Sequence, residues 1–419
     1  MTLFGLDETV VLERARGVRA GGDEQSTETF ARATWTGIAE PGDSMAGLLV
    51  GGLGAVNALN AIIDGWSPTR LADALLAVGA EGSQLREDVT QGVERWRPRL
   101  KSGDVVRYLM QAERVGAHLL VPGDPLWPDA VGDLGTHAPL ALWWRGVPRA
   151  LEALERSISL VGARAATGYG EHVTLEASAG LVDRGFAIVS GAAYGIDGMA
   201  HRAALASFGT TVAFLAGGVD RFYPAGHDAL LAQIVDTGAV ISELPCGSSP
   251  TKWRFLQRNR LIAGASNATI VLEAGWRSGS LNTAGHAAAL GRPLGAVPGP
   301  VTSPTSTGCH RLIREYDAVC VTDADEMAEL AGGDSVGRFP RKAPGVPMPD
   351  EGRNGERSSD QVRAIDALSR RSPRSVQDIA GRAGLSTSAV VAALGALGLE
   401  GVVRERDAGW VLASGRMTA

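Results

Sequence analysis

The pattern of apolar residues changes character twice along the 419-residue chain. Up to about residue 100, apolar residues recur at the spacing of one helix face, which predicts amphipathic helices. Asp43 after Pro41-Gly42, and Ser67 before Pro68, are typical helix-start signals. The predicted helices are Glu28–Ala39, Ser44–Val50, Ala55–Ile63 and Thr69–Ala77. We therefore expect an N-terminal helical (SAM- or helix-hairpin-helix-like) domain over residues 1–100.

The Gly-rich turn at Gly51–Gly54 has two interpretations. It resembles a helix-hairpin-helix element, in which backbone amides of the turn can hold a phosphate; the alternative is a domain that serves packing alone. This segment holds 9 basic and 14 acidic residues, which favours packing. The 20 residues from Ser44 to Ile63 are uncharged, long enough for a membrane span, but their glycines and asparagines would be costly in lipid. We expect two packed helices and no membrane span.

From Ile158 onward, short continuous apolar runs alternate with helical stretches. This alternation predicts βαβ units and a buried parallel sheet covered on both faces, an α/β fold with an extended Rossmann-like core. We place the domain at residues 101–332 and its core at 156–325. The strands are expected at Ile158–Val161, Ala187–Ser190, Thr211–Leu215, Ala239–Ser242, Thr269–Leu272, Leu294–Val297 and Ala318–Val321. The helices are expected at Gly168–Arg184, Ile196–Ala206, Asp228–Asp236, Leu281–Leu290 and His310–Glu315. Residues 101–155 form a connector with one helix, a loop and a strand.

Residues 333–360 are rich in Pro, Gly and charge, which predicts a flexible linker. Residues 361–419 then show three helices and a hairpin, the pattern of a winged-helix domain. Ser375 and Ser386 are expected to cap the second and third helices, and Gly384 to end the second. The helices are predicted at Gln361–Leu368, Ser375–Ala383 and Ser386–Leu397.

Small residues follow several predicted strands and open the next helix, an arrangement that favours a bound anion. The loops are Gly162-Ala163-Arg164, Gly191–Asp197 and Glu273–Ser280. Because ligands sit at the carboxyl ends of strands in an open parallel sheet, three such loops predict a phosphate ligand. Arg164 adds a planar guanidinium suited to phosphate oxygens. The alternative is that the glycines serve packing only. Neither a P-loop nor GxGxxG occurs, which argues against a P-loop NTPase or an ordinary dinucleotide binder.

The stretch from Leu244 to Leu272 has four basic residues and no acidic one. The basic residues are Lys252, Arg254, Arg258 and Arg260, with Trp253 and Phe255 between them. Such a stretch suits a phosphate backbone, and the aromatic rings suit unpaired bases. The alternative is a solvated basic face with both rings in the core. Next to the phosphate-like loops we favour a binding site, with a helix beginning at Arg258 and Asn259.

The whole-chain charge first points away from nucleic acid. The chain has 40 Lys+Arg and 46 Asp+Glu, a formal net charge of −6. The first hundred residues contribute 9 − 14 = −5, however, so the acidic balance lies away from the basic stretch. Three cysteines without a CxxC pair predict a reduced, cytoplasmic protein, and the acidic N-terminus lacks the basic start of a signal peptide.

Some residues are spaced as catalytic or metal-binding residues can be, but we favour a purely structural role for each of them. Asp197 and His201 are spaced for a metal pair, but no third ligand of suitable spacing follows, so a helix-start acid and a hydrogen-bonded histidine are expected. Cys309-His310 is interpreted as an incidental turn and not as a thiol nucleophile. No metal or cofactor is expected.

Glu243 and Glu273 end two strands at the predicted site. They would suit hydrolysis as paired carboxylates, but we favour ion pairs with Arg258 or Arg260. No catalytic residue is therefore expected.

Eight motifs together resemble those of one family. They occur over about residues 120–325, in the order found in the DNA-processing protein A (DprA/Smf) family. The motifs are VGAR, SGAAYGIDGMAH, AGGVDRFYP, SELP, RNRLIAG, EAGWRSGSLNTA, LGRPLGAVPGP and GCHRLI. The resemblance implies a single-stranded DNA-binding protein that forms homodimers through the Rossmann-like domain. It implies protection of DNA entering during natural transformation, loading of the RecA recombinase, and no catalytic turnover.

Carried over by position, the resemblance implies DNA contacts in four segments, with Arg254 added from the basic stretch. The residues are Gly162 and Arg164; Ser190 and Gly191; Lys252, Arg254, Arg258, Asn259 and Arg260; and Ser278, Gly279 and Ser280. Ala163 and Tyr194 depart from the family's usual VGSR and SGLARGID.

Two other functions stay open on the sequence. Related Rossmann-like proteins cleave nucleoside monophosphates, but their PGGxGTxxE stretch has no counterpart here. A winged helix also suggests a transcription regulator, and residues 361–419 carry 8 basic and 5 acidic residues. The expected recognition helix, Ser386–Leu397, holds no Arg, Lys, Asn or Gln for base edges, so we favour a protein-interaction or auxiliary role for this domain.

Overall fold

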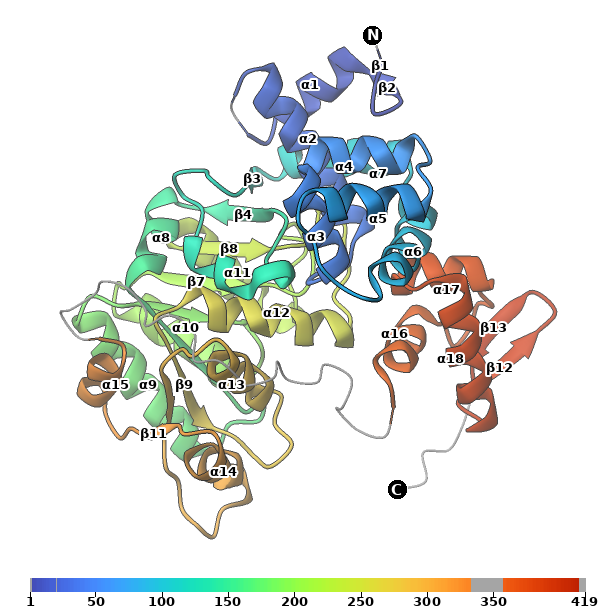
Figure 1. Cartoon of the computed structure of the whole chain (residues 1–419). Coiled ribbons are helices and arrows are strands. Elements are labelled where there is room, and N and C mark those ends of the chain that lie inside the picture. The colour runs from blue at the N-terminus through green and yellow to red at the C-terminus, as the bar shows by residue number, and fades with distance from the viewer. Residues whose placement is uncertain (1, 20, 333–356, 414–419) are drawn as a thin grey trace. The chain divides into compact units, whose positions relative to one another are not determined.

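The computed structural model describes residues 2–19, 21–332 and 357–413 (Figure 1). The chain divides into two compact units. One comprises Met1–Glu113, Thr251–Trp253 and Glu351–Ala419; the other comprises Arg114–Pro250 and Arg254–Asp350. The sequence-based domain boundaries stay predictions.

The first unit begins with a short hairpin and seven helices. Asp43 and Ser67 cap α3 and α5 through their side-chain oxygens, as their sequence signals predict. The sequence pattern missed α1 and α6 and began α2 five residues late. The elements are β1 (Thr2–Leu3), β2 (Leu6–Asp7), α1 (Glu8–Arg16), α2 (Asp23–Ile38), α3 (Ser44–Leu53), α4 (Ala55–Ile63), α5 (Pro68–Ala77), α6 (Leu85–Trp96) and α7 (Ser102–Arg114), with a 3-10 turn at Arg97–Arg99.

Helices α3 and α4 meet at Gly54, whose φ of 79° is readily adopted only by glycine. They are bent by 109°, which confirms the prediction of two packed helices. In the described part of the chain, no single helix has the length and apolar character to cross a bilayer. The pairs α3–α4 and Val376–Ala383 with Thr387–Leu399 pass that test only when joined across their bends.

The same unit contains the winged-helix elements. Ser375 and Ser386 cap α17 and α18, and Gly384 ends α17 in the left-handed conformation, as predicted. Helix α16 starts at Ser359, inside the predicted linker, because Ser358 and Gln361 form a capping box. The rest of that linker, 333–356, lies outside the described residues. The elements are α16 (Ser359–Ala367), α17 (Val376–Ala383), α18 (Thr387–Leu399), β12 (Val403–Arg406) and β13 (Gly409–Leu412).

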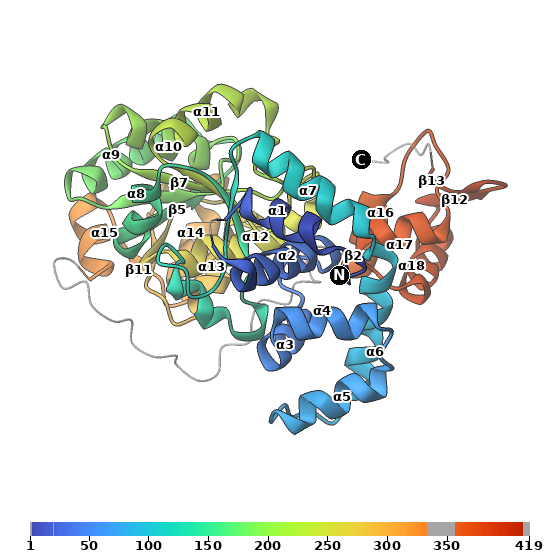
Figure 2. The same cartoon turned by 90° about the horizontal axis from the view of Figure 1, so that it is seen from above.

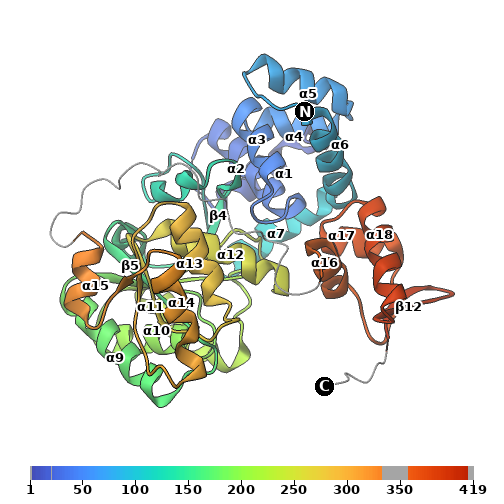
Figure 3. The same cartoon turned by 60° about the horizontal axis from the view of Figure 1, so that its bottom comes forward.

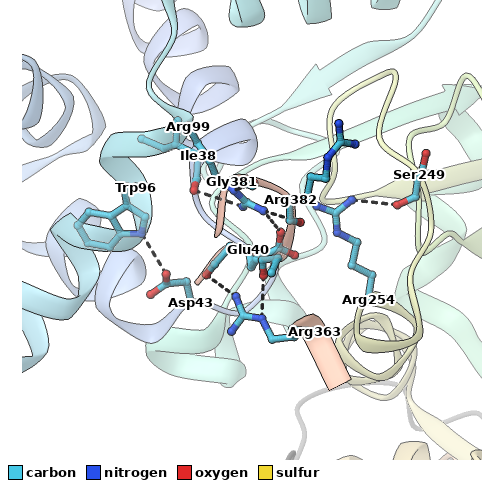
Figure 4. Close-up of polar contacts among 12 residues, drawn as sticks. Ile38, Glu40, Asp43, Trp96, Arg99, Ser249, Arg254, Arg363, Gly381 and Arg382 are labelled. Atoms are coloured by element: carbon cyan, nitrogen blue, oxygen red, sulfur yellow. Dashed lines mark hydrogen bonds and ion pairs between the residues drawn. The ribbon is translucent and has the colours of Figure 1, made fainter. Parts of the chain in front are cut away.

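Arg99 joins the N-terminal helices to the end of α17 (Figure 4). Its guanidinium donates to the carbonyl oxygens of Gly381 at 2.7 Å and Arg382 at 3.2 Å, and pairs with Glu40 at 2.5 Å. The last carbonyls of a helix lack intrahelical partners and carry negative potential, so a buried cation stabilises them. Arg363 donates to the carbonyl oxygens of Ala383 and Gly384. The two arginines thus cap one helix end.

Arg99→Ala should lower the free energy of unfolding of the first unit by about 2 kcal/mol, because Glu40 and two carbonyls lose a buried donor. The effect stays moderate because Arg363 remains within electrostatic reach of Glu40. Urea unfolding of the full chain measures it. Arg97→Ala is the matched control, since the exposed Arg97 side chain donates to the Trp66 carbonyl oxygen in the same region. Equal stability of the two variants would contradict the capping role.

The second unit is built on a nine-stranded sheet in the order β11-β10-β9-β5-β6-β7-β8-β4-β3. Seven strands run parallel, and β4 and β3 add an antiparallel edge beside β8. The sheet is therefore mixed and mostly parallel. The strands are β3 (His118–Leu120), β4 (Leu142–Gly146), β5 (Ser157–Gly162), β6 (Ala187–Ser190), β7 (Thr211–Phe214), β8 (Ala239–Ser242), β9 (Ala268–Glu273), β10 (Leu294–Ala296) and β11 (Val319–Cys320).

Helices cover both faces of this sheet (Figure 2). On one face, α9, α10 and α15 pack against β5, β6 and β9 through a cluster that contains Leu181, Ile196 and Met327. On the other, α12, α13 and α14 bury Ile262, Ala287 and Leu312, and they lie near one another in Figure 3. The helices are α8 (Pro148–Glu152), α9 (Gly168–Asp183), α10 (Ile196–Ala206), α11 (Asp228–Thr237), α12 (Lys252–Ala265), α13 (Ser280–Ala289), α14 (Thr307–Glu315) and α15 (Ala324–Leu330).

This unit confirms the predicted α/β class. The chain leaves β5 toward β6 on one side and later returns to β9 on the other, so the switch point of the sheet lies between β5 and β9. Ligands of open α/β sheets bind outside the strand ends at such a point.

Candidate nucleic-acid site

A pocket of about 480 Å³ opens at the carboxyl ends of β5 and β9, at the switch point. Its walls are formed by the loops after these two strands, the start of α10 and one side of α12. Charged groups from all of these segments face it: Arg164, Asp197, Arg258 and Arg277. The predicted residues that line it are Gly162, Arg164, Arg258, Asn259, Ser278, Gly279 and Ser280.

Arg164 is exposed in the loop after β5. Its guanidinium carbon lies 5.3 Å from the centre of the Phe255 ring, which comes from α12 and also lines the pocket. A guanidinium over an aromatic ring is held by the ring's quadrupole while its N–H groups stay available. This pair therefore presents a cation and an apolar face to the same space.

Arg258 is buried, and the protein fixes it in place. Its Nη1 donates to the carbonyl oxygens of Gly191 at 2.6 Å and Phe214 at 2.7 Å. A Cβ on Gly191 would lie 2.2 Å from that nitrogen, so glycine is needed here to admit the guanidinium. Burial lowers the pKa of Arg258 to about 10, with Arg164 adding to the effect and Asp197 opposing it. It remains a cation at neutral pH.

Two of the three helix starts at this edge already hold an acid of the chain. Asp197, in the first turn of α10, accepts from the Gly191 N–H at 3.2 Å, and burial raises its pKa despite Arg258 beside it. Glu273 accepts from the backbone N–H of Thr167 at 2.9 Å and from its hydroxyl at 2.7 Å, before α9. An external anion is therefore disfavoured at both starts.

Helix α13 differs, because serines and a glycine begin it. Ser278, Gly279 and Ser280 line the pocket, and the two serine hydroxyls lie 2.7 Å apart. The Ser280 N–H donates to Ser278 Oγ at a long 3.4 Å. The dipole of α13 adds positive potential. Of the three predicted anion loops, this one alone keeps a helix start without a carboxylate.

Arg260, a DNA contact by the resemblance, does not line the pocket. Its side chain is 0% exposed and forms a bidentate pair with Glu243 at 2.6 and 2.7 Å. It also donates to the carbonyl oxygens of His137 and Gln257. The ion pair expected of Glu243 is therefore confirmed, while Glu273 bonds to Thr167 and not to an arginine. We assign Arg260 a structural role and leave it out of the contact set.

Four other predicted residues do not line the pocket. Ser190 is buried and donates to the Leu160 carbonyl oxygen at 2.6 Å, and Gly191 makes room for Arg258 and accepts from it. Arg254 donates back to the Ser249 carbonyl oxygen (Figure 4), and exposed Lys252 opens α12. Helix α12 begins there, six residues before the predicted start at Arg258. Contacts to DNA by these four stay predictions.

Arg277 and Phe255 line the pocket but were absent from the predicted contacts. Arg277 is exposed directly before Ser278, and its place in EAGWRSGS was the available signal. Phe255 was singled out for stacking, but the sequence did not separate it from Trp253, which is buried. His201 bonds to the Thr211 hydroxyl, as a structural histidine should.

Substitution of Gly279 tests whether a DNA strand comes close to the start of α13. A Cβ built on it meets nothing within 4 Å, and its φ of −62° suits alanine, so Gly279→Ala should fold with unchanged stability. A strand packed on this surface would meet the added methyl, which should weaken binding by about 1 kcal/mol. Fluorescence anisotropy with an oligonucleotide measures it. Gly168→Ala is the control, because that site is equally open but does not line the pocket. Identical affinities would place the strand elsewhere.

An α/β sheet whose switch-point pocket gathers arginines and an aromatic ring is typical of Rossmann-like proteins that bind nucleotides or nucleic acids. Comparison with known proteins identifies the family. Residues 118–332 match the model of DNA recombination-mediator protein A, and residues 348–409 match the DprA winged helix domain. The chain belongs to the DprA/Smf family, as its motifs predicted.

Three relatives illustrate the likeness. A putative DNA processing protein DprA of Mycobacterium tuberculosis is 47% identical over 270 residues, covering 62% of this chain and 68% of that protein. Protein Smf of Escherichia coli is 39% identical over 213 residues, covering 51% of this chain and 56% of that protein. The X-ray structure of DNA processing protein A from Streptococcus pneumoniae matches with a TM-score of 0.55 and 28% identity, over 72% of this chain and 97% of that one.

Proposed function

We propose that this chain is a recombination mediator that binds single-stranded DNA in the pocket between β5 and β9. The observation that carries the proposal is the convergence of Arg164, Arg258 and Arg277 with the Phe255 ring and the start of α13. Fixed cations suit phosphates, and an accessible ring suits an unpaired base, which a duplex does not offer. The DNA contacts we propose are Gly162, Arg164, Arg258, Asn259, Arg277, Ser278, Gly279 and Ser280.

Within this proposal the protein protects incoming single strands during natural transformation or recombination and loads RecA onto them. These steps, and homodimerisation through the Rossmann-like domain, are supported by membership of the DprA/Smf family. We propose a cytoplasmic, non-enzymatic role. The positions of Glu243 and Glu273 support it, because each is buried and bonded to a structural partner and the two do not form an acid–base pair.

We assign the winged helix to protein contacts and not to base recognition. Helix α18 carries no Arg, Lys, Asn or Gln, and Val390, Leu394 and Leu397 on it are buried. The bidentate amide and guanidinium groups that pair with purine edges in a major groove are therefore absent from this helix.

A salt series of binding to single- and double-stranded oligonucleotides tests the proposed function. We expect a strong preference for single strands and a linear fall of log K with log salt. Absence of binding at low salt would overturn it, and release of base from a nucleoside monophosphate would favour a hydrolase instead.

A further inference from the structure

Trp276 lies in the loop between β9 and α13, and the residue is 56% exposed. Its neighbours on both sides, Gly275 and Arg277–Ser280, line the pocket. Of the nine tryptophans, all of which fall in the described residues, it is the exposed one. Leaving a large apolar ring in water forgoes the stabilisation that burial gives. An exposed ring beside a binding pocket therefore points to a ligand that covers it.

The indole is held from the side of α14. The Arg311 guanidinium carbon lies 4.8 Å from the Trp276 ring centre and 5.6 Å from that of Tyr316. Glu315 accepts from Arg311 Nε at 2.8 Å, which keeps the guanidinium in this position. A stacked cation restricts the ring's orientation while leaving more than half of its surface exposed.

The backbone under Trp276 is also fixed. The Gly308 N–H, at the start of α14, donates to the Ala274 carbonyl oxygen at 2.7 Å. A Cβ on Gly308 would lie 2.6 Å from the Gly275 carbonyl oxygen, so the loop and α14 are in close backbone contact. The Ser278 N–H closes a turn onto Gly275 at 3.1 Å. The ring is therefore presented on a preorganised support, which reduces the entropy lost on binding.

We propose that Trp276 is a second stacking platform, which takes the nucleobase next to the nucleotide in the pocket. This rests on the proposed function and adds a subsite to it. Exposed Arg277 follows Trp276 directly in the sequence, lines the pocket and supplies a cation for the phosphate between the two bases. Phe255 in the pocket and Trp276 at its rim then contact successive bases of one strand. The subsite reads no sequence, because every base offers a π face.

The test compares two oligonucleotides of equal length, oligothymidylate and its abasic analogue, by anisotropy at fixed salt. Both carry the same phosphates, and only the first carries bases. Trp276→Ala should weaken binding of oligothymidylate by about 5- to 100-fold and change binding of the abasic strand less than about twofold. Trp276→Phe should restore most of the affinity. Phe208→Ala is the control, because that residue is 99% exposed and precedes the amino end of β7, whereas the pocket lies at the carboxyl ends of strands.

Each other result overturns the subsite. Equal loss on both strands would assign Trp276 to folding or to a protein contact, and no loss on either would leave the ring outside the strand's path. If wild-type protein binds neither strand, the proposed function itself fails. If Arg164→Ala weakens binding and Trp276→Ala does not, only the subsite fails.

Discussion

Replacing Arg260 with alanine should lower the free energy of unfolding of the second unit by about 3–5 kcal/mol. The guanidinium is fully buried and donates to Glu243 and to two backbone carbonyl oxygens. Its removal leaves the Glu243 carboxylate, itself 8% exposed, as an unpaired charge in the interior. Such a charge loses both its hydration and its partner.

Urea unfolding of the variant measures this loss. The double variant Glu243→Leu/Arg260→Met should recover part of the stability, because no uncompensated charge remains in it. A loss below about 1 kcal/mol in the single variant would contradict the structural role, and would return Arg260 to the set of DNA contacts.

Replacing Arg164 with alanine should weaken single-strand binding by about 1.5–3 kcal/mol, roughly 10- to 150-fold, and leave the fold intact. Its side chain is exposed, so substitution creates neither a cavity nor an unpaired buried group. It stacks on Phe255 at 5.3 Å, which places its N–H groups at the pocket. A charged hydrogen bond to a phosphate is the interaction lost.

Arg202→Ala is the control for this variant. Arg202 is an exposed arginine on α10 that does not line the pocket, so its removal changes the net charge equally. Comparable weakening by both variants would mean that the chain attracts DNA by its general charge. It would contradict the assignment of the DNA-binding site to the pocket.

The sequence predicted the parallel strands well because each is a continuous apolar run buried on both faces. Strands β6 and β8 and helix α10 have the predicted limits. The antiparallel edge was not predicted as part of the sheet. Strands β3 and β4 come before the βαβ pattern, and their pairing with β8 is a long-range contact that local periodicity does not encode.

The site was predicted in place but not in detail. From the sequence, Arg164, Arg258 and Arg260 were all predicted to contact DNA. In the structure Arg164 is exposed, Arg258 is buried at the pocket, and Arg260 is paired with Glu243. The glycines likewise differ in role. Gly162 is small because a Cβ would meet Ile196 at 2.6 Å, whereas Gly279 faces open space. These differences depend on which elements pack together, and the local pattern of residues in the sequence does not reveal that packing.

The most direct test of DNA binding in this pocket is the salt dependence of single-strand binding by wild-type protein and by Arg164→Ala. Each phosphate contact contributes about −0.7 to the slope of log K against log salt for a single strand. We expect a slope shallower by about 0.7 in the variant, and by about 1.4 in Arg164→Ala/Arg277→Ala. Identical slopes for all three proteins would show that these arginines contact no phosphate, and would contradict the assignment of this pocket to DNA.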